Sequence, residues 1–336
     1  MEAVSRPRPG DVLSAQDYLR GLVVRTPVLR SMALDERAGC RLVAKAECLQ
    51  LTGSFKVRGA LNRVRMLSAE ARAGGLLTVS AGNAALGLAF AGHVLGAGVT
   101  VVMPQDAVPA KVDGVRALGG TVVQDGVLDA AGAFRRAAQL QEQHGYTFVH
   151  PFDDPYVVAG AATATLELLE QEPGAGRLVV PCSGGGLLAG AILAAETAGR
   201  TIEIVGVQPD LVPTIVRSLE AGEPTEVDHP PTIADGLTAP RPGRLNFGMI
   251  RSAGVRIVTV SEAAIRTAVR ELVMTLKVVV EPSAAVGLAA ILDGKLGAIN
   301  GGTALLLSGG NISPAVLADC VCPMPDPLRR RTLEAT

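Results

Sequence analysis

Lysine is scarce in this chain, so each lysine is a candidate for amine chemistry. Among 31 basic residues only five are lysines, namely Lys45, Lys56, Lys111, Lys277 and Lys295. Lys56 follows Gly53-Ser54 at the expected start of a helix, with apolar residues around it. Burial and the positive end of a helix dipole both disfavour an ammonium, so we expect a lowered pKa for Lys56. Such an amine can form a Schiff base with an aldehyde, and a surface lysine opening an amphipathic helix is the alternative.

A glycine-rich turn between a predicted strand and a predicted helix could bind a phosphate. It reads Ser183-Gly184-Gly185-Gly186-Leu187. Glycines let backbone N–H groups converge on an anion, and the start of the helix adds partial positive charge. Gly184, Gly186 and Ala189 also match the loose dinucleotide fingerprint, but the next strand ends at Gln208 without the acidic residue that this fingerprint needs. A phosphate cradle is therefore favoured over a nicotinamide site, with a plain tight turn as a third possibility.

Two further turns at the ends of predicted strands carry polar groups. Ser80-Ala81-Gly82-Asn83 could hold a carboxylate on its backbone amides, or Asn83 could simply cap a helix. Ser308-Gly309-Gly310-Asn311 offers a hydroxyl and close backbone approach, or a plain turn. An amine, a phosphate cradle, a carboxylate loop and a hydroxyl together fit a phosphorylated aldehyde cofactor and an amino acid. That combination points to pyridoxal 5′-phosphate.

The elements that must position these groups alternate between strands and helices. Short apolar runs typical of buried parallel strands lie at residues 42–46, 76–79, 99–103, 121–124, 147–149, 178–181, 202–207, 256–260 and 304–307. Predicted helices separate them, so the pattern indicates an α/β protein with mostly parallel sheets. Ligands of such sheets bind beyond the carboxyl ends of strands, where all the turns above lie.

Composition narrows the class of protein further. Hydrophobic residues make up 48% of the 336 residues and charged residues 19%, with a net charge of −1. This balance supports a large core and gives no reason to expect nucleic acid as a partner. We expect no membrane partner either, because no apolar run is long enough to span a bilayer and the first residues show no secretory signal. Five scattered cysteines indicate reduced thiols and a cytoplasmic location.

The chain resembles the fold type II pyridoxal-phosphate enzymes, within them the serine/threonine dehydratase and serine racemase group. The resemblance runs from about Ser14 to Leu317 and rests on seven marks in family order: Gly53-Ser54-Phe55-Lys56-Val57-Arg58-Gly59-Ala60, Ser80-Ala81-Gly82-Asn83, His150-Pro151-Phe152-Asp153-Asp154-Pro155, Ser183-Gly184-Gly185-Gly186-Leu187, Thr232-Ile233-Ala234-Asp235-Gly236-Leu237, Glu281-Pro282-Ser283 and Ser308-Gly309-Gly310-Asn311. It implies two lobes, each with a mostly parallel twisted sheet flanked by helices. Residues 1–74 and 151–336 would form a large cofactor-binding domain, and residues 75–150 a small domain with the carboxylate loop.

The resemblance also implies a role for each matching residue. Lys56 holds the cofactor covalently and moves the Cα proton, with Phe55 packed beside the cofactor ring. The phosphate is bound by the backbone amides of Ser183, Gly184, Gly185, Gly186 and Leu187. Asn83 meets the phenolic oxygen, and Ser308 meets the pyridine nitrogen. The substrate carboxylate is held by Ser80, Ala81, Gly82 and Asn83.

Several positions depart from the family pattern. Ala84 stands where family members usually have a histidine, and Gly160-Ala161-Ala162-Thr163 replaces the usual Gly-Gln-Gly-Thr. If these alanines face the substrate, the pocket is larger and more apolar than a threonine site. Racemases of this group carry a second serine where this chain has Ala81, so racemisation is not expected. Gln208 and Thr214 occupy the positions of the acidic metal-binding pair of eukaryotic members, so no bound metal is expected.

The resemblance implies a PLP-dependent ammonia-lyase and a homodimer. The reaction would be β-elimination of water from a β-hydroxy-α-amino acid, threonine- or serine-like or bulkier, giving a 2-oxo acid and ammonia. Three alternatives remain: β-replacement or another specialised pyridoxal-phosphate reaction, a cofactor-binding protein without turnover, and the NAD-dependent dehydrogenase considered above.

Overall fold

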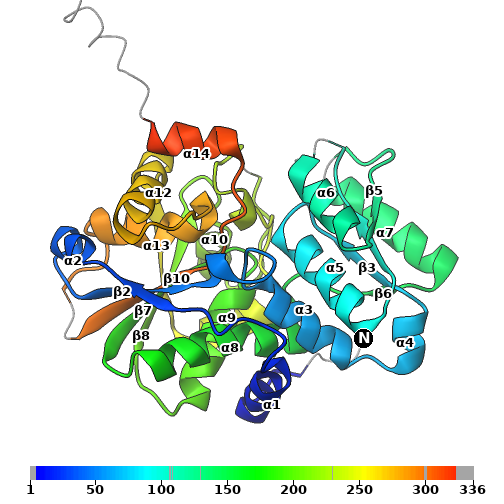
Figure 1. The fold of residues 1–336 in the computed structure, drawn as a ribbon, viewed down its shortest axis with the longest axis horizontal. Helices are drawn as coiled ribbons and strands as arrows, with labels where there is room; N and C mark the ends of the chain where they lie inside the picture. The colour runs from blue at the N-terminus through cyan, green and yellow to red at the C-terminus, as the bar shows by residue number, and fades with distance from the viewer. Residues whose placement is uncertain are drawn as a thin grey trace, which may run out of the picture.

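The computed structural model describes residues 5–105, 107, 109–128, 130–228, 230–298 and 301–322, with only the backbone at residues 130 and 131. Parts of the large domain expected from the sequence, residues 1–4 and 323–336, therefore lie outside the described residues. The described chain forms two sheets, flanked by helices and placed on opposite sides of the view in Figure 1. The expected α/β class with mostly parallel sheets is confirmed.

The larger sheet has six strands in the order β1-β2-β10-β7-β8-β9, and only β1 runs antiparallel to its neighbour. Alternate residues of its central strands face two different apolar clusters, one under α12 and α13 and the other under α8 and α9. Burial on both faces explains why these strands read as continuous apolar runs. The strands are β1 Val28–Arg30, β2 Leu42–Ala46, β7 Ala175–Pro181, β8 Glu203–Pro209, β9 Arg256–Val260 and β10 Gly302–Leu307.

The smaller sheet has four parallel strands in the order β5-β4-β3-β6. They are β3 Leu76–Val79, β4 Val99–Val102, β5 Thr121–Val123 and β6 Thr147–Phe148. All four lie within residues 75–150, the range proposed for the small domain. The apolar core on one face of this sheet also takes in side chains of α3, which comes before that range. The domain bounds remain a prediction.

The helices cover both faces of the two sheets (Figure 1). They are α1 Pro9–Leu19, α2 Met32–Ala38, α3 Lys56–Arg65, α4 Ala69–Ala73, α5 Asn83–Leu95, α6 Pro109–Ala117, α7 Ala130–His144, α8 Pro155–Gln171, α9 Gly186–Thr197, α10 Thr214–Ala221, α11 Arg244–Ala253, α12 Glu262–Leu276, α13 Pro282–Leu292 and α14 Pro314–Val321, with 3₁₀ turns η1 Glu47–Leu49 and η2 Asp235–Leu237. Three of them, α3, α5 and α9, begin at residues that the sequence marked for chemistry, namely Lys56, Asn83 and Gly186.

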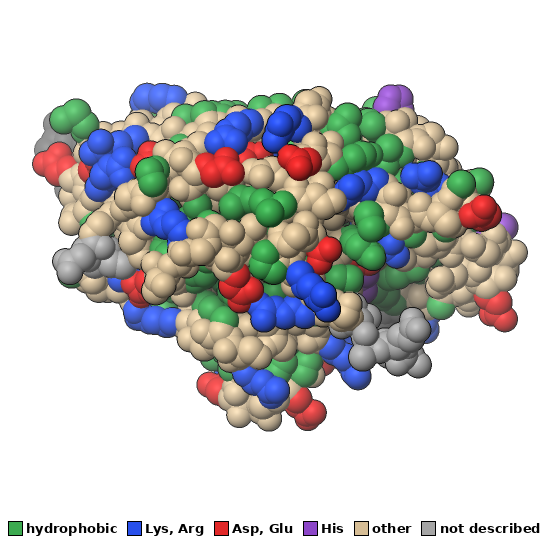
Figure 2. Space-filling model, turned by 90° about the horizontal axis from the view of Figure 1, so that it is seen from below, with side chains coloured by type: hydrophobic (Ala, Val, Ile, Leu, Met, Phe, Trp, Pro, Cys, Tyr) green, Lys and Arg blue, Asp and Glu red, His purple; other side chains and the backbone are tan. Residues whose placement is uncertain are grey.

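The outer surface carries charges of both signs. Figure 2 shows basic and acidic side chains interspersed with apolar ones over the face that it presents. This face has no extended area of one sign. No helix in the described part of the chain has both the length and the apolar character needed to cross a membrane.

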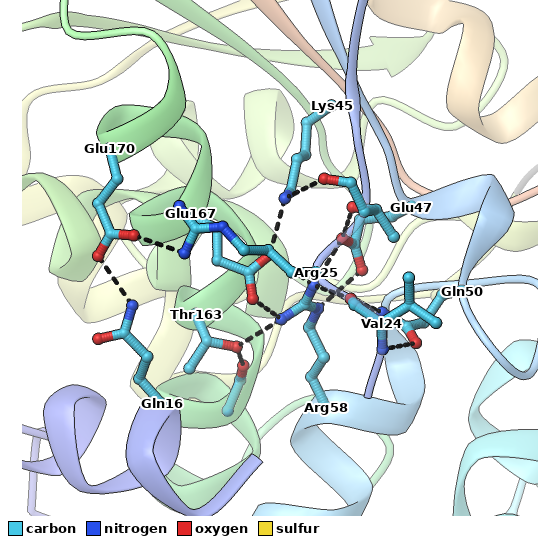
Figure 3. Close-up of polar contacts among 12 residues, drawn as sticks. Gln16, Val24, Arg25, Lys45, Glu47, Gln50, Arg58, Thr163, Glu167 and Glu170 are labelled. Atoms are coloured by element: carbon cyan, nitrogen blue, oxygen red, sulfur yellow. Dashed lines mark hydrogen bonds and ion pairs between the residues drawn. The ribbon is translucent and has the colours of Figure 1, made fainter. Parts of the chain in front are cut away.

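A buried ion cluster ties α3 to the large sheet (Figure 3). The Arg58 guanidinium donates to Glu47 at 2.8 and 2.9 Å and to Glu167 at the same two distances. Lys45 donates to Glu167 at 2.7 Å. Burial disfavours the charge on Arg58, but the two carboxylates outweigh this and raise its pKa. The cluster therefore pairs two cations with two anions inside the protein.

Replacing Arg58 should destabilise the fold strongly, because it would leave Glu47 and Glu167 short of a buried partner. For Arg58→Met we expect a loss of about 3–5 kcal/mol in the free energy of unfolding, measured by urea denaturation. Arg116→Met is the matched control, because the Arg116 side chain is 58% exposed. A loss below about 1 kcal/mol in Arg58→Met would contradict an anchoring role.

Candidate active site

Lys56 is the first residue of α3, and its side chain is partly buried. Its Nζ donates to the carbonyl oxygen of Pro151 at 2.9 Å and lies 5.3 Å from the centre of the Phe55 ring. Burial lowers the pKa of the Lys56 amine to about 8, although the nearby Glu281 carboxyl opposes the shift. The amine is thus far easier to deprotonate than an exposed lysine, as the sequence predicted.

The turn before Lys56 is joined to the end of β10. Phe55 N donates to the carbonyl oxygen of Ser308 at 3.0 Å, and Gly310 N donates to that of Gly53 at 2.9 Å. Gly53 has a φ of +70°, and a Cβ there would lie 2.3 Å from Oδ1 of Asn311. Only glycine suits this place. The close contact brings Ser308, from the other end of the sequence, next to the segment that carries Lys56.

Asn83 is held by residues from two distant parts of the chain. Its Nδ2 donates to both carboxyl oxygens of Glu281, at 2.9 and 3.0 Å, and its Oδ1 accepts from Nδ2 of Asn311 at 2.8 Å. Glu281 is 3% exposed, and burial raises the pKa of its carboxyl to about 7, against the effect of the Asn83 hydrogen bond. The orientation of the Asn83 amide is therefore fixed.

The glycine-rich loop leaves a row of backbone donors unused. Within the described residues, the N–H groups of residues 183–187 donate to no acceptor. Gly185 has a φ of +92°, and a Cβ on Gly184 would lie 2.4 Å from the Phe152 ring. The Ser183 hydroxyl accepts from Ala239 N at 3.1 Å. The loop and the start of α9 together form a cradle for an anion.

The loop before α5 forms a second, smaller set of free donors. Ser80 Oγ accepts from Gly82 N at 3.2 Å, which shapes the turn. The N–H groups of Ala81, Asn83 and Ala84 have no acceptor within the described part of the chain. This arrangement can receive a carboxylate, as expected for the segment from Ser80 to Asn83.

These residues fit a phosphorylated aldehyde. The cradle at residues 183–187 suits a phosphate, and the Lys56 amine suits an aldehyde. The buried hydroxyls of Thr52 and Ser54 have no hydrogen-bond partner among the described residues. Unpaired buried hydroxyls are costly unless another group meets them, so they are further candidates for contact with a bound polar molecule.

Comparison with known proteins agrees with this fit. The family model described as "Pyridoxal-phosphate dependent enzyme" matches residues 19–309. The chain belongs to this family. The expected cofactor class and the expected fold are therefore confirmed.

The similar proteins fall in the group that the sequence resembles. An L-threonine ammonia-lyase of Thermotoga maritima is 40% identical over 303 residues, covering 90% of this chain and 75% of that protein. A crystal structure of a threonine deaminase from T.th. has a TM-score of 0.86 at 43% identity, covering 91% of this chain and 99% of that one. Maize serine racemase has a TM-score of 0.89 at 32% identity, covering 98% and 99%. The resemblance to the serine/threonine dehydratase and serine racemase group is confirmed.

The site has more contributors than the residues with an expected role. Pro151, His150, Glu281 and Asn311 all contact or border Lys56 or Asn83. Each lies in a segment that carried the family resemblance, yet none received a role. Glu281 could have been found from its place in the sequence, directly before a proline and an apolar helix. A carboxylate buried in such a place is rare, so it suggests a function.

The positions expected to lack a metal are used for another purpose. Gln208 Nε2 donates to Thr214 Oγ1 at 3.1 Å, and Gln208 Oε1 accepts from the N–H groups of Ile215 and Val216, in the first turn of α10, at 3.1 and 3.3 Å. Gln208 thus satisfies the start of α10. No group of three His, Cys, Asp or Glu side chains within the described ranges could hold a metal ion. Independence from Mg²⁺ and Ca²⁺ remains a prediction.

The lowered pKa of Lys56 can be measured in the full-length, cofactor-free protein. Competitive acetylation across a pH series, followed by peptide mass spectrometry, reports each of the five lysines separately. We expect the reactivity of Lys56 to rise with pH through a midpoint near 8, because deprotonation creates the nucleophile. The exposed Lys277 and Lys295 serve as internal references. A Lys56 midpoint above about 10, close to that of an ordinary lysine, would contradict burial of the amine.

Proposed function

We propose that this protein is a PLP-dependent ammonia-lyase. It removes water from a β-hydroxy-α-amino acid and releases a 2-oxo acid and ammonia. The observation that carries the proposal is the setting of Lys56, an amine of lowered pKa that donates to Pro151. The next residue, Phe152, packs on Gly184 of the phosphate cradle, and Gly87 of the helix after the carboxylate loop packs on the Lys56 backbone. The ammonia-lyase name of the Thermotoga relative and the deaminase name of the similar structure support the same reaction.

In this proposal each group of residues has one task. Lys56 holds the cofactor and moves the proton at Cα of the substrate. Residues 183–187 bind the phosphate through their N–H groups, and the loop from Ser80 to Asn83 binds the carboxylate. Bound pyridoxal phosphate supplies the electron sink for the bond broken at Cα. The Ser308 hydroxyl would meet the ring nitrogen of the bound cofactor and, being no counter-ion, would make the sink mild, which would favour loss of the β-hydroxyl over transamination.

The space that Ala84 adds beside Lys56 is small. Ala84 borders a cavity beside Lys56 of only about 20 Å³, with Leu88 and Val149 on its walls. The alanine therefore opens a space for about one water molecule rather than for a ring. We propose a substrate of serine or threonine size. Ala81 offers no hydroxyl on the carboxylate loop, which argues against a serine-racemase type of reaction.

A spectroscopic assay tests the proposal. The protein loaded with pyridoxal phosphate should show a visible absorption band that shifts with serine or threonine, while 2-oxo acid accumulates. Lys56→Ala should lower turnover by at least about 10³-fold, because no other amine replaces it. Lys295→Ala, at an exposed position, is the matched control and should keep full activity.

Other outcomes would indicate the alternatives. A response confined to phenylserine would mean that the alanines widen the site. A band that shifts without 2-oxo acid, with product formed only when a thiol is added, would indicate β-replacement. A band that never shifts would indicate a protein that binds the cofactor without turnover. Full activity in Lys56→Ala would refute the mechanism.

We further propose that the enzyme is a cytoplasmic homodimer. All five cysteines are free, as is typical of a reducing compartment. Met32 on α2 is 85% exposed and Met274 on α12 is 53% exposed, and an ion pair between Arg37 and Glu271 joins these two helices. Exposed apolar side chains on adjoining helices favour contact with a second copy of the chain.

Light scattering coupled to size exclusion tests the dimer. We expect twice the chain mass of 34.4 kDa for the unmodified protein. A Met32→Lys, Met274→Lys double variant should shift the mass toward one chain, because two charges would be buried without partners. Leu128→Lys is the control, since Leu128 is 79% exposed but far from α2 in sequence and lies before α7. A single-chain mass for the unmodified protein would refute the dimer.

A further inference from the structure

A small cavity of about 20 Å³ lies beside the amine of Lys56, the residue that holds the cofactor in the proposed function. Most of its lining is apolar, including Ala60, Leu88 and Val157. Three lining residues bring polar groups, namely Thr78, His150 and Lys56 itself. A space of about 10–15 Å³ already holds a water molecule when two to four polar partners surround it. The cavity meets both conditions.

The proton of the His150 ring is fixed on Nε2. Its Nδ1 accepts hydrogen bonds from Asp153 N at 2.9 Å and from Phe152 N at 3.3 Å. Two donors directed at Nδ1 leave no place for a proton there, so the neutral ring carries its proton on Nε2. The ring is half-buried, and its hydrogen bonds to other described residues are those at Nδ1, with none from Nε2–H. His150 therefore has an unused donor and borders the cavity.

His150 is neutral over the working pH range. Burial lowers its pKa to about 4, and the charges of Lys56 and Arg241 add to the effect, while Asp153 opposes it. These groups come from α3, from the loop before α11 and from the segment before α8, the elements packed around the ring. A neutral imidazole beside Lys56 adds no positive charge that would compete with the amine.

We propose that one ordered water occupies this cavity and joins His150 to Lys56. Its oxygen accepts from Nε2–H of His150. When the Lys56 amine is neutral, one hydrogen of the water goes to its lone pair, and the other goes to Oγ1 of Thr78. That hydroxyl is free to accept, because its own proton goes to the carbonyl oxygen of Val149 at 2.9 Å. Three hydrogen bonds are the usual number for a buried water.

His150 is then a positioning residue for Lys56. The neutral amine has two fixed partners, the Pro151 carbonyl oxygen as acceptor and the water as donor, and they direct its remaining N–H away from the cavity. Donation into the lone pair favours the neutral amine, so the water adds to the effect of burial on the pKa of Lys56. The methyl group of Ala84 is what leaves room for the water.

Imidazole NMR tests the site in full-length protein before cofactor loading, so the outcome does not depend on whether the enzyme is an ammonia-lyase. The chain has only four histidines, and a His150→Asn variant assigns the signal of His150. We expect the Nε2–H form, with no titration between about pH 5.5 and 8. Ala84→Val fills the cavity and leaves His150 in place, and it should shift the Nε2–H signal. An Nδ1–H form, a midpoint near about 6.5, or a signal unmoved by Ala84→Val would overturn the proposal.

Competitive acetylation measures the effect on Lys56. Asparagine at position 150 can still accept from Asp153 N but cannot reach the cavity, so His150→Asn separates the shape of the turn from the water contact. We expect the Lys56 midpoint to rise by about half a unit or more above 8. Loaded with cofactor, the variant should lose kcat with little change in KM. His144→Asn is the matched control, and an unchanged Lys56 midpoint in His150→Asn would overturn the positioning role.

Discussion

The ion cluster around Arg58 is the constraint on which the catalytic geometry depends. Arg58 and Lys56 are two residues apart on α3, so their side chains leave the helix about 200° apart. Locking the guanidinium to Glu47 and Glu167 on one side therefore aims the amine to the other side. The nearby cavity of about 330 Å³ is lined by Arg58, Thr163 and Glu167, whose polar atoms already bond to one another.

Close helix packing completes the positioning. A Cβ on Gly160 would lie 2.5 Å from the carbonyl oxygen of Arg58, and one on Gly87 would lie 3.0 Å from the backbone of Lys56. Helices α8 and α5 therefore contact the first turn of α3 from two sides, with no room for a larger residue. Thr163, which this segment of α8 shares with the family pattern, contacts Arg58 through its hydroxyl at 3.3 Å. The two departures in the segment, Ala161 and Ala162, are both buried within α8, and the polar contact to the anchor is kept.

The sequence predicted the parts of the fold and site that are local. Glycine-rich turns, strand runs and a lysine at a helix start each follow from neighbouring residues. The helix start at Lys56 and the turn at residues 183–187 could therefore be placed in advance, while their contacts with the cofactor remain a prediction. The edge strand β1 is three residues long and α2 only seven, too short for a hydrophobic period to show. The roles of His150 and Glu281 could not be predicted, because they depend on contacts between residues distant in sequence. Glu281 acts on Asn83, 198 positions away, and only the fold brings them together.

The polar groups around Arg58 and those of the cofactor site differ in whether their hydrogen-bond donors are paired. Around Arg58, charges of opposite sign are paired and the donors are used, which stabilises one arrangement. In the glycine-rich loop and in the turn before Lys56, the N–H groups of residues 183–187 and the hydroxyl of Ser54 are left without partners among the described residues. Unused donors cost stability in the free protein, and a bound phosphate and aldehyde would satisfy them. The paired charges around Arg58 thus hold the unpaired groups of the site in place until the cofactor binds. Binding of the cofactor should then stabilise the fold as well as enable the reaction.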